Sequence, residues 1–176
     1  MTQQPNPYGA APDLPPVQVY PYAHWGQRVG AFLIDYLLYM VAAAPLWIGY
    51  GLLAASVDTT TRADGTLVAT DVDVSPAVVG LMVLGGLTAL AFFIWNYCLR
   101  GGRTGWTVGK GVVGIRLVST RTGQPIGAGM AFLRQIAHIL DGLPCYLGYL
   151  WPLWDAKRQT FADKVISTVV VVQPRG

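Results

Sequence analysis

A long apolar run begins with Arg28-Val-Gly-Ala-Phe-Leu-Ile-Asp35-Tyr-Leu-Leu-Tyr-Met-Val41 and continues to Ala55. About 20 apolar residues cross the hydrocarbon core of a bilayer, so this run is long enough to form a transmembrane helix. Asp35 lies inside the run, about two helical turns after Arg28. A charge within a membrane helix costs about 2.5–3.5 kcal/mol on insertion scales. We therefore expect Asp35 to be paired, protonated or functional.

The composition also indicates a membrane protein. The chain has 176 residues, of which 53% are hydrophobic and only 12% are charged, and its mean hydropathy is +0.42. Soluble domains carry about 25% charged residues, so we predict an integral membrane protein. The net charge of +3 is small, and the cations are spread beside apolar segments instead of forming one basic stripe. This pattern argues against nucleic-acid binding and is typical of charges that orient membrane helices.

Two transmembrane helices are predicted, over residues 29–55 and 76–99. The first should bend in its second half, where Pro45 interrupts the helical hydrogen bonds. The second should begin at Ser75-Pro76, because serine caps helices well and proline suits the first helical turn.

Charges beside these helices predict their orientation in the membrane. Residues 56–75 hold four aspartates and one arginine, and we interpret them as a polar external loop. Residues 100–129 hold five cations and no acid, so the positive-inside rule makes them cytoplasmic. The Pro-rich residues 1–27 then form a disordered cytoplasmic tail, which is either a solvated leader or a docking strip for a partner.

A third apolar stretch covers residues 130–154 and is interrupted at Asp141-Gly-Leu-Pro144. A full crossing would place the following cations outside, whereas a re-entrant or interfacial element keeps them inside. We favour the second arrangement because Pro144 breaks a helix. The β-prone segments at 115–119 and 167–173 flank this stretch and predict a short cytoplasmic β pair. The predicted fold is an all-α, multi-pass membrane protein with two transmembrane helices, a third broken element and this β pair.

Three polar residues within the third stretch share one helix face. Arg134, His138 and Asp141 stand at positions i, i+4 and i+7. They could present a polar face to water or form a structural ion-pair network. The alternative is a cation or proton site built from Asp35, Asp141 and His138, since histidine titrates near neutrality and a desolvated carboxyl group can approach it.

Gly109-Lys-Gly111-Val-Val-Gly114 matches the G-x-G-x-x-G pattern of dinucleotide sites. The pattern lacks the preceding strand and the acidic residue about 20 positions later, so no nucleotide site is predicted. The glycines are expected to allow tight turns at the membrane surface. The sequence also contains no Ser-His-Asp order, no paired glutamates and no His/Cys cluster. We therefore expect no enzyme activity, no cofactor and no metal site.

Four landmarks in this order resemble the RDD family of bacterial membrane proteins, which is named for an arginine and two aspartates. They are Gln27-Arg28-Val-Gly-Ala-Phe-Leu-Ile-Asp35, Arg103-Thr-Gly-Trp-Thr-Val-Gly109-Lys110-Gly-Val-Val-Gly114-Ile-Arg-Leu-Val118, Arg134, and Lys157-Arg-Gln-Thr-Phe-Ala-Asp163-Lys-Val-Ile-Ser-Thr168. The resemblance implies an RDD-like membrane domain over residues 28–172, preceded by a tail similar to that of Pro-rich mycobacterial membrane proteins. It also implies that Arg28 is the family arginine and Asp35 the first aspartate. The second falls on Asp163, with Asp155 as the alternative.

Two function classes remain open for such a chain. The first is a structural or accessory subunit that binds a larger membrane complex. The second is a minimal oligomeric transporter of ions or small solutes that uses an intramembrane aspartate; some members of the family are described as sodium/proton antiporters. We favour the first class, because ion pairs offer a structural use for every charge named above. The expected partners are the lipid bilayer and either a membrane complex or further copies of the chain.

Two specific contacts are predicted. Arg28 should pair with Asp163 near the cytoplasmic surface and so tie the first helix to the C-terminal segment. Asp35 should face the bundle interior, where Arg134 is the best candidate to neutralise it. Direct pairing of Arg28 with Asp35 is not expected, because the two residues are two helical turns apart.

Overall fold

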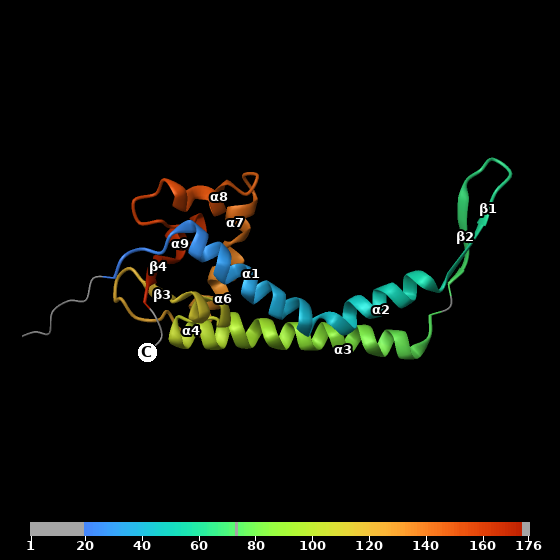
Figure 1. The fold of residues 1–176 in the computed structure, drawn as a ribbon, viewed down its shortest axis with the longest axis horizontal. Helices are drawn as coiled ribbons and strands as arrows, with labels where there is room; N and C mark the ends of the chain where they lie inside the picture. Colours follow the sequence, from blue (N-terminus) through green and yellow to red (C-terminus); the bar gives the residue numbers. More distant parts are fainter. Residues whose placement is uncertain (1–19, 73, 174–176) are drawn as a thin grey trace, which may run out of the picture.

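The structure is a computed structural model that describes residues 20–72 and 74–173. Two long helical segments lie side by side, with a small folded head at one end and a β-hairpin at the other (Figure 1). The head consists of residues 105–173 together with residues 20–28. Most of the predicted Pro-rich tail, residues 1–19, lies outside the described residues.

The first apolar run forms two helices, α1 (Trp25–Ala42) and α2 (Ala44–Ala55). Their axes are bent by 57° at Ala43, and Pro45 follows in the first turn of α2. Proline has no backbone N–H to donate, so it cannot continue the hydrogen bonds of α1. The predicted bend is therefore present, although α1 begins at Trp25, earlier than expected.

The second apolar segment is one continuous helical rod. It comprises α3 (Pro76–Phe93), the π-helical turn η1 (Ile94–Arg100) and α4 (Gly101–Thr104). Oγ of Ser75 accepts a hydrogen bond from the backbone N–H of Val78 at 3.5 Å, which confirms the predicted start. The rod is 29 residues long and apolar enough to cross a membrane, and α1 with α2 passes the same test only as a bent pair.

Glycine lets α2 and α3 approach closely. A Cβ atom at Gly85 would collide with the backbone of Leu46, and one at Gly49 would collide with Met82. Near the bend, the hydroxyl group of Thr88 donates a hydrogen bond to the backbone oxygen of Ala42 at 2.6 Å. Small residues and this hydrogen bond thus help to hold α1 and α2 against α3, as in other membrane helix pairs.

Residues 56–75, predicted as a polar loop, instead contain an antiparallel hairpin of β1 (Val57–Thr61) and β2 (Leu67–Val72). The turn contains Asp64-Gly65, and Gly65 adopts a positive φ of 85°. Oδ1 of Asp64 accepts a hydrogen bond from the N–H of Thr66 at 2.9 Å. Asp-Gly is a strong hairpin signal, so the loop prediction was wrong for a reason visible in the sequence.

The predicted β pair is present in the head. Strands β3 (Ile115–Ser119) and β4 (Thr168–Val172) run antiparallel, and Ile115 lies opposite Val172. Tyr22 forms a bridge with Val171 on the free edge of β4, and Ala23 is completely buried. The tail boundary expected at residue 27 is therefore too late, because residues 22–27 already belong to the fold.

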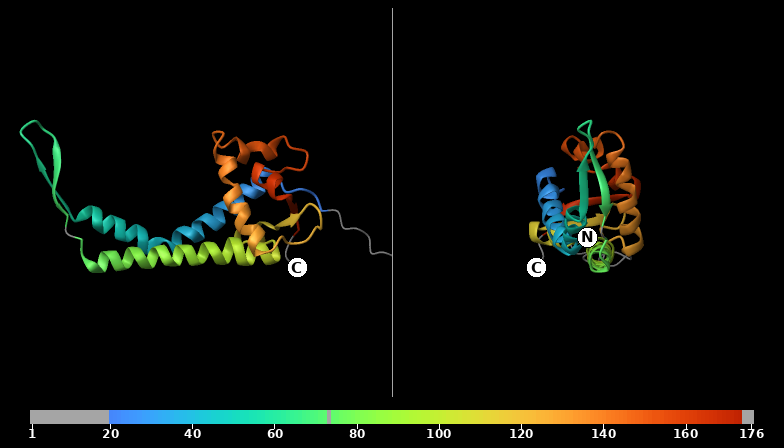
Figure 2. Two further views of the ribbon diagram at one scale, coloured as in Figure 1. Left: turned by 180° about the vertical axis from the view of Figure 1, so that it is seen from behind. Right: turned by 90° about the vertical axis from the view of Figure 1, so that its right-hand side faces the viewer.

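The third apolar stretch is broken into short pieces. They are α6 (Ala128–Ala137), α7 (Ile139–Gly142), α8 (Leu147–Leu150) and the 3-10 turn η2 (Trp151–Leu153). The longest piece has 10 residues, half of what a crossing needs, so the predicted break is found and no single helix of this stretch is long enough to cross a membrane. Figure 2 shows that α6 runs across the direction of α3, not along it.

Two further short helices complete the head. Helix α5 (Val108–Val113) packs against α1, and α9 (Phe161–Ile166) packs against α6. Two glycines of the G-x-G-x-x-G pattern have structural roles in α5. Gly109 lies against α1, where a Cβ atom would collide with the backbone oxygen of Ala31, and Gly114 ends α5 with a φ of 75°.

Candidate functional site

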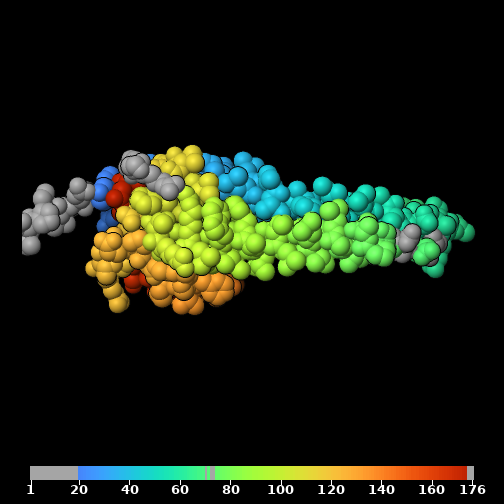
Figure 3. All heavy atoms as spheres, turned by 90° about the horizontal axis from the view of Figure 1, so that it is seen from below, coloured from blue at the N-terminus to red at the C-terminus, as the bar shows by residue number. Residues whose placement is uncertain are grey.

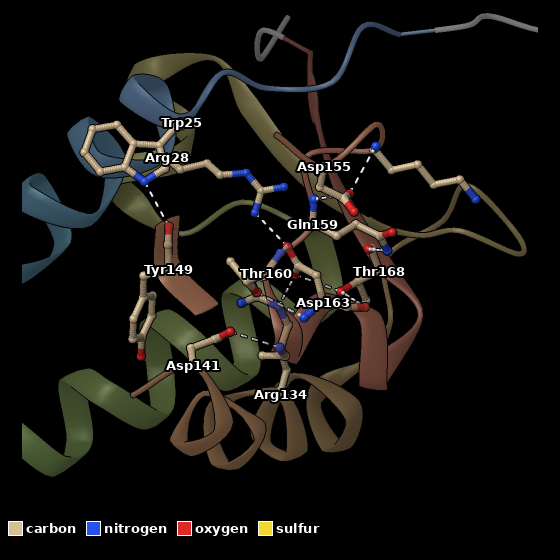
Figure 4. Close-up of polar contacts among 12 residues, drawn as sticks. Trp25, Arg28, Arg134, Asp141, Tyr149, Asp155, Gln159, Thr160, Asp163 and Thr168 are labelled. Carbon is tan, nitrogen blue, oxygen red and sulfur yellow. Dashed lines mark hydrogen bonds and ion pairs between the residues drawn. The ribbon is translucent and has the colours of Figure 1, made fainter. Parts of the chain in front are cut away.

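A cluster of buried charges is centred on Asp163, which is completely buried at the start of α9. Nη1 of Arg28 on α1 lies 2.7 Å from Oδ2 of Asp163. On the other side, Nε and Nη2 of Arg134 on α6 lie 2.9 Å and 2.8 Å from Oδ1 (Figure 4). The hydroxyl group of Thr168 on β4 also donates to Oδ1, at 3.0 Å. One carboxylate therefore joins four elements of the head.

The predicted pairing of Arg28 with Asp163 is thus present. Asp155, the alternative to Asp163, contacts Lys164 at 2.5 Å instead. Arg134 was predicted to neutralise Asp35, and this is wrong because Arg134 binds Asp163. The error arose from matching opposite charges without knowing that α6 packs on α9.

Local sequence explains why Asp163 is held so firmly. Thr160 and Asp163 form a capping box at the N-terminus of α9, in which each side chain accepts from the backbone N–H of the other. Thr160-Phe-Ala-Asp163 has the spacing of this motif, so the sequence carried a signal for Thr160 that was missed. Burial would raise the pKa of Asp163, but Arg134 and Arg28 outweigh it and hold the pKa well below its usual range.

Asp35 occupies a second polar site, between α1, η1 and α5. It is 2% exposed, which confirms that it faces inward. Oδ1 accepts hydrogen bonds from Nδ2 of Asn96 at 2.8 Å and from the backbone N–H of Gly109 at 2.7 Å. Oδ2 accepts from the hydroxyl group of Thr107 at 2.5 Å. Neutral donors on η1 and at the start of α5 therefore solvate the carboxylate. Asn96 and Thr107 are thus site residues, and matching opposite charges in the sequence did not find them.

The π-helical turn η1 helps to place these donors. Asn96 lies in this turn and is completely buried. Its Nδ2 donates to Asp35, and its Oδ1 accepts from the backbone N–H of Val108 at 2.8 Å. The side-chain amide of Asn96 thus links three elements: α1, η1 of the long rod, and α5. A buried asparagine in an apolar helix was the signal in the sequence, because such groups are rarely left without partners.

His138 and Asp141 form a third polar group in the head. Nδ1 of His138 lies 2.6 Å from Oδ2 of Asp141, and the imidazole ring stacks on Tyr149. Oδ1 of Asp141 accepts from the backbone N–H of Phe161 at 2.7 Å. The polar face of α6 and α7 therefore points into the protein. Of the alternatives left open by the sequence, the structural network is found and the water-facing arrangement is not.

The structure does not bring Asp35 together with His138 and Asp141. Asp35 binds donors on η1 and α5, whereas the other two residues bind each other and α9. Their partners differ, so a single cation site built from all three is not formed. Among the described residues, no group of three or more His, Cys, Asp or Glu side chains could hold a metal ion.

Lys110 is a further titratable residue that sequence analysis did not single out as a site. Burial lowers its pKa to about 8, and the positive charges of Arg134 and Arg28 act in the same direction. Asp35 and Asp163 oppose this shift. Lys110, on α5, is therefore influenced by the charges of both carboxylate sites.

Comparison with known proteins places this arrangement in a family. The model of the RDD family matches residues 22–167. The chain belongs to the RDD family. It is 40% identical over 156 residues to the "Proline-rich antigen homolog" of Mycobacterium tuberculosis, and 38% identical over 159 residues to the "Proline-rich antigen" of Mycobacterium leprae.

These alignments cover 85% and 84% of the RDD chain, but only 63% and 60% of the two relatives. No solved structure matches it. Membership of the RDD family and the long apolar rod Pro76–Thr104 together support association with a membrane. In this RDD protein Arg28 and Asp163 meet, whereas Asp35 has its own partners.

Proposed function

We propose that the chain is a multi-pass accessory protein of the bacterial inner membrane, which binds a larger membrane complex and neither transports nor catalyses. One observation carries this proposal: each buried aspartate is already engaged by groups of the protein itself. Asp35 accepts from three donors, Asp163 binds two arginines, and Asp141 binds His138 and the start of α9.

The distribution of polar groups along the helices supports this choice over transport. No Asp, Glu, Lys, Arg or His follows Asp35 in the apolar run as far as Ala55. Thr88, the main polar group on the facing part of α3, donates to the backbone of Ala42. An ion crossing between these helices would meet no further charged ligand, which is costly inside a bilayer.

The outer faces of the helical rods are apolar and exposed. On α1 these residues include Phe32, Leu37 and Val41, and on α3 they include Val83 and Leu87. Monomeric soluble proteins rarely expose so continuous an apolar surface. In the proposed role, lipid and the helices of the larger complex cover it.

The charges give the proposed orientation. The head and the start of α1 lie at the basic end, and the acidic hairpin of β1 and β2 lies at the opposite end (Figure 1). The positive-inside rule then places the head and the N-terminal tail in the cytoplasm and the hairpin outside.

The test is purification of the full chain in mild detergent from its native membrane after chemical cross-linking. We expect one membrane complex to co-purify in fixed stoichiometry. An Asp163→Asn variant, in which the head is loosened, should recover less of that complex at equal chain abundance. Recovery of the chain alone as a homo-oligomer would contradict the accessory role and favour the transporter.

A further inference from the structure

On α6 and α7 the charged side chains are buried and the apolar side chains are exposed, an arrangement that we call inside out. Arg134 and Asp141 are only 6% and 0% exposed, because they bind α9. The opposite face is apolar and exposed, and Leu143 at the end of α7 is 73% exposed. A helix on a water-soluble protein has the reverse arrangement. The exposed residues of this apolar stripe are Phe132, Leu133, Ile136, Ile139, Leu140 and Leu143.

The apolar stripe continues past the break in the chain. Leu147 on α8, Leu153 on η2 and Trp154 directly after it are exposed, and Tyr146 between α7 and α8 is 69% exposed. Aromatic side chains of this kind favour the boundary between lipid headgroups and acyl chains. From Ile139 to Trp154 the only charged residue is Asp141, which is buried.

The stripe is also continuous with the apolar surface of the long rod. Helix α6 packs against η1, where Ile94 and Trp95 are exposed. Figure 3 shows α6 and α7 beside α3 on one face of the molecule. Because α6 runs across α3, a bilayer that α3 crosses would contain α6 in its plane (Figure 2). Two cations, Lys157 and Arg158, follow the stripe directly in the sequence.

We infer that residues 132–154 form a foot that inserts its apolar stripe into the cytoplasmic leaflet, with α6 in the plane of the membrane, while Lys157 and Arg158 bind anionic headgroups. This inference rests on the membrane location proposed above. In-plane elements of this kind bury their apolar face about 5–10 Å into the leaflet. The polar face then needs partners inside the protein, which Asp163 and α9 provide. In this arrangement lipid covers the apolar side of α6 and α7, and the rest of the head covers their polar side.

Cys145 offers a direct probe of the foot. It is exposed at the tip of the element, next to Tyr146, whereas Cys98 is buried. The full chain with Cys98→Ala is labelled at Cys145 with an environment-sensitive fluorophore and reconstituted into phosphatidylcholine vesicles, with or without phosphatidylglycerol. A matched control is cysteine-free except for Thr122→Cys, because Thr122 lies exposed in the polar turn after β3.

We expect the label at Cys145 to emit at short wavelength. Lipids that carry a nitroxide on the acyl chain should quench it several-fold more than aqueous iodide does, and the label at residue 122 should show the reverse. If the two labels show the same emission and quenching in chains that float with the vesicles, the foot is ruled out but the membrane location is not. Failure of the full chain to float would overturn both the foot and the proposed membrane location.

A second variant tests the headgroup contact. Lys157→Gln with Arg158→Gln removes the two cations but leaves the apolar stripe intact. Phosphatidylglycerol should increase acyl-chain quenching at Cys145 in the parent chain, and this increase should be lost in the double variant. Quenching that is independent of phosphatidylglycerol in both chains would overturn the assignment of anionic lipid as the partner.

Discussion

Arg28 and Asp163 are 135 positions apart in the sequence, yet Nη1 of the arginine lies 2.7 Å from Oδ2 of the aspartate. The contact ties the start of α1 to the start of α9, at the centre of the head. Arg134 completes the cluster from the other side, on Oδ1. This buried carboxylate therefore ties α6, α9 and β4 of the head to the start of α1.

Replacing Asp163 with Asn should destabilise the fold strongly. The change leaves two buried guanidinium groups without their counter-charge, and breaking a buried ion pair in this way costs about 3–5 kcal/mol. Asp155→Asn is the matched control, because its partner Lys164 is 43% exposed and an ion pair with an exposed partner is worth about 1 kcal/mol or less. Thermal unfolding of both variants in detergent provides the comparison. Equal losses would show that the cluster does not organise the head.

The same carboxylate predicts a pH dependence. Its pKa in the folded protein is below the unfolded value of about 3.9, so the folded state favours the ionised form. This contribution is complete above the unfolded pKa and is lost as the pH falls from about 4 towards the folded value. We expect the unfolding temperature to drop below pH 4 in the wild-type chain, and to drop less in Asp163→Asn. An identical acid profile in the two chains would refute this assignment.

The two arginines should differ in their tolerance of lysine. Arg134 uses both Nε and Nη2 on Asp163, whereas Arg28 uses Nη1. Within the described part of the chain, Nε and Nη2 of Arg28 have no hydrogen-bond partner. Arg134→Lys should therefore cost about 1.5–3 kcal/mol, the value of a charged hydrogen bond, and Arg28→Lys should cost less. Unfolding midpoints in the reverse order would contradict this geometry.

Replacing Asp35 with Asn should destabilise the fold less than replacing it with Ala. In Asp35→Asn the remaining oxygen can still accept from Asn96 and Gly109, and the new amide can donate to the hydroxyl oxygen of Thr107. Weakening three charge-assisted bonds to neutral ones should cost about 1–2 kcal/mol, whereas Asp35→Ala leaves three buried donors unpaired and should cost at least about 3 kcal/mol. If thermal unfolding finds both variants equally unstable, the charge of Asp35 matters and not its hydrogen-bond geometry.

Strong local signals and opposite charges made part of this structure predictable. Ser75-Pro76 marked the start of α3, and the β-branched residues at 168–172 marked β4. The pair of Arg28 with Asp163 followed from the resemblance to the RDD family together with their opposite charges. The hairpin was missed because its polar composition hid the Asp64-Gly65 turn. Local patterns of this kind need no knowledge of tertiary contacts.

The partners of Asp35 could not be predicted in the same way. A carboxylate can be solvated by neutral donors such as Asn96, Thr107 and a backbone N–H, and these leave no charge pattern to match. Their convergence depends on η1 and on the packing of Gly109 against α1. The inside-out arrangement of α6 was likewise hidden, because a helical period shows two faces but not which one points inward.

The most direct test of the account is an ion-flux measurement on purified full-length chain in proteoliposomes that contain a pH-sensitive dye. Sodium and proton gradients are imposed at acidic, neutral and alkaline pH, with Asp35→Asn as the comparison. If the buried aspartates serve only the fold, the wild-type vesicles should leak protons no faster than protein-free vesicles under any gradient. A sodium-driven proton flux that is present in the wild type and lost in Asp35→Asn would contradict the account.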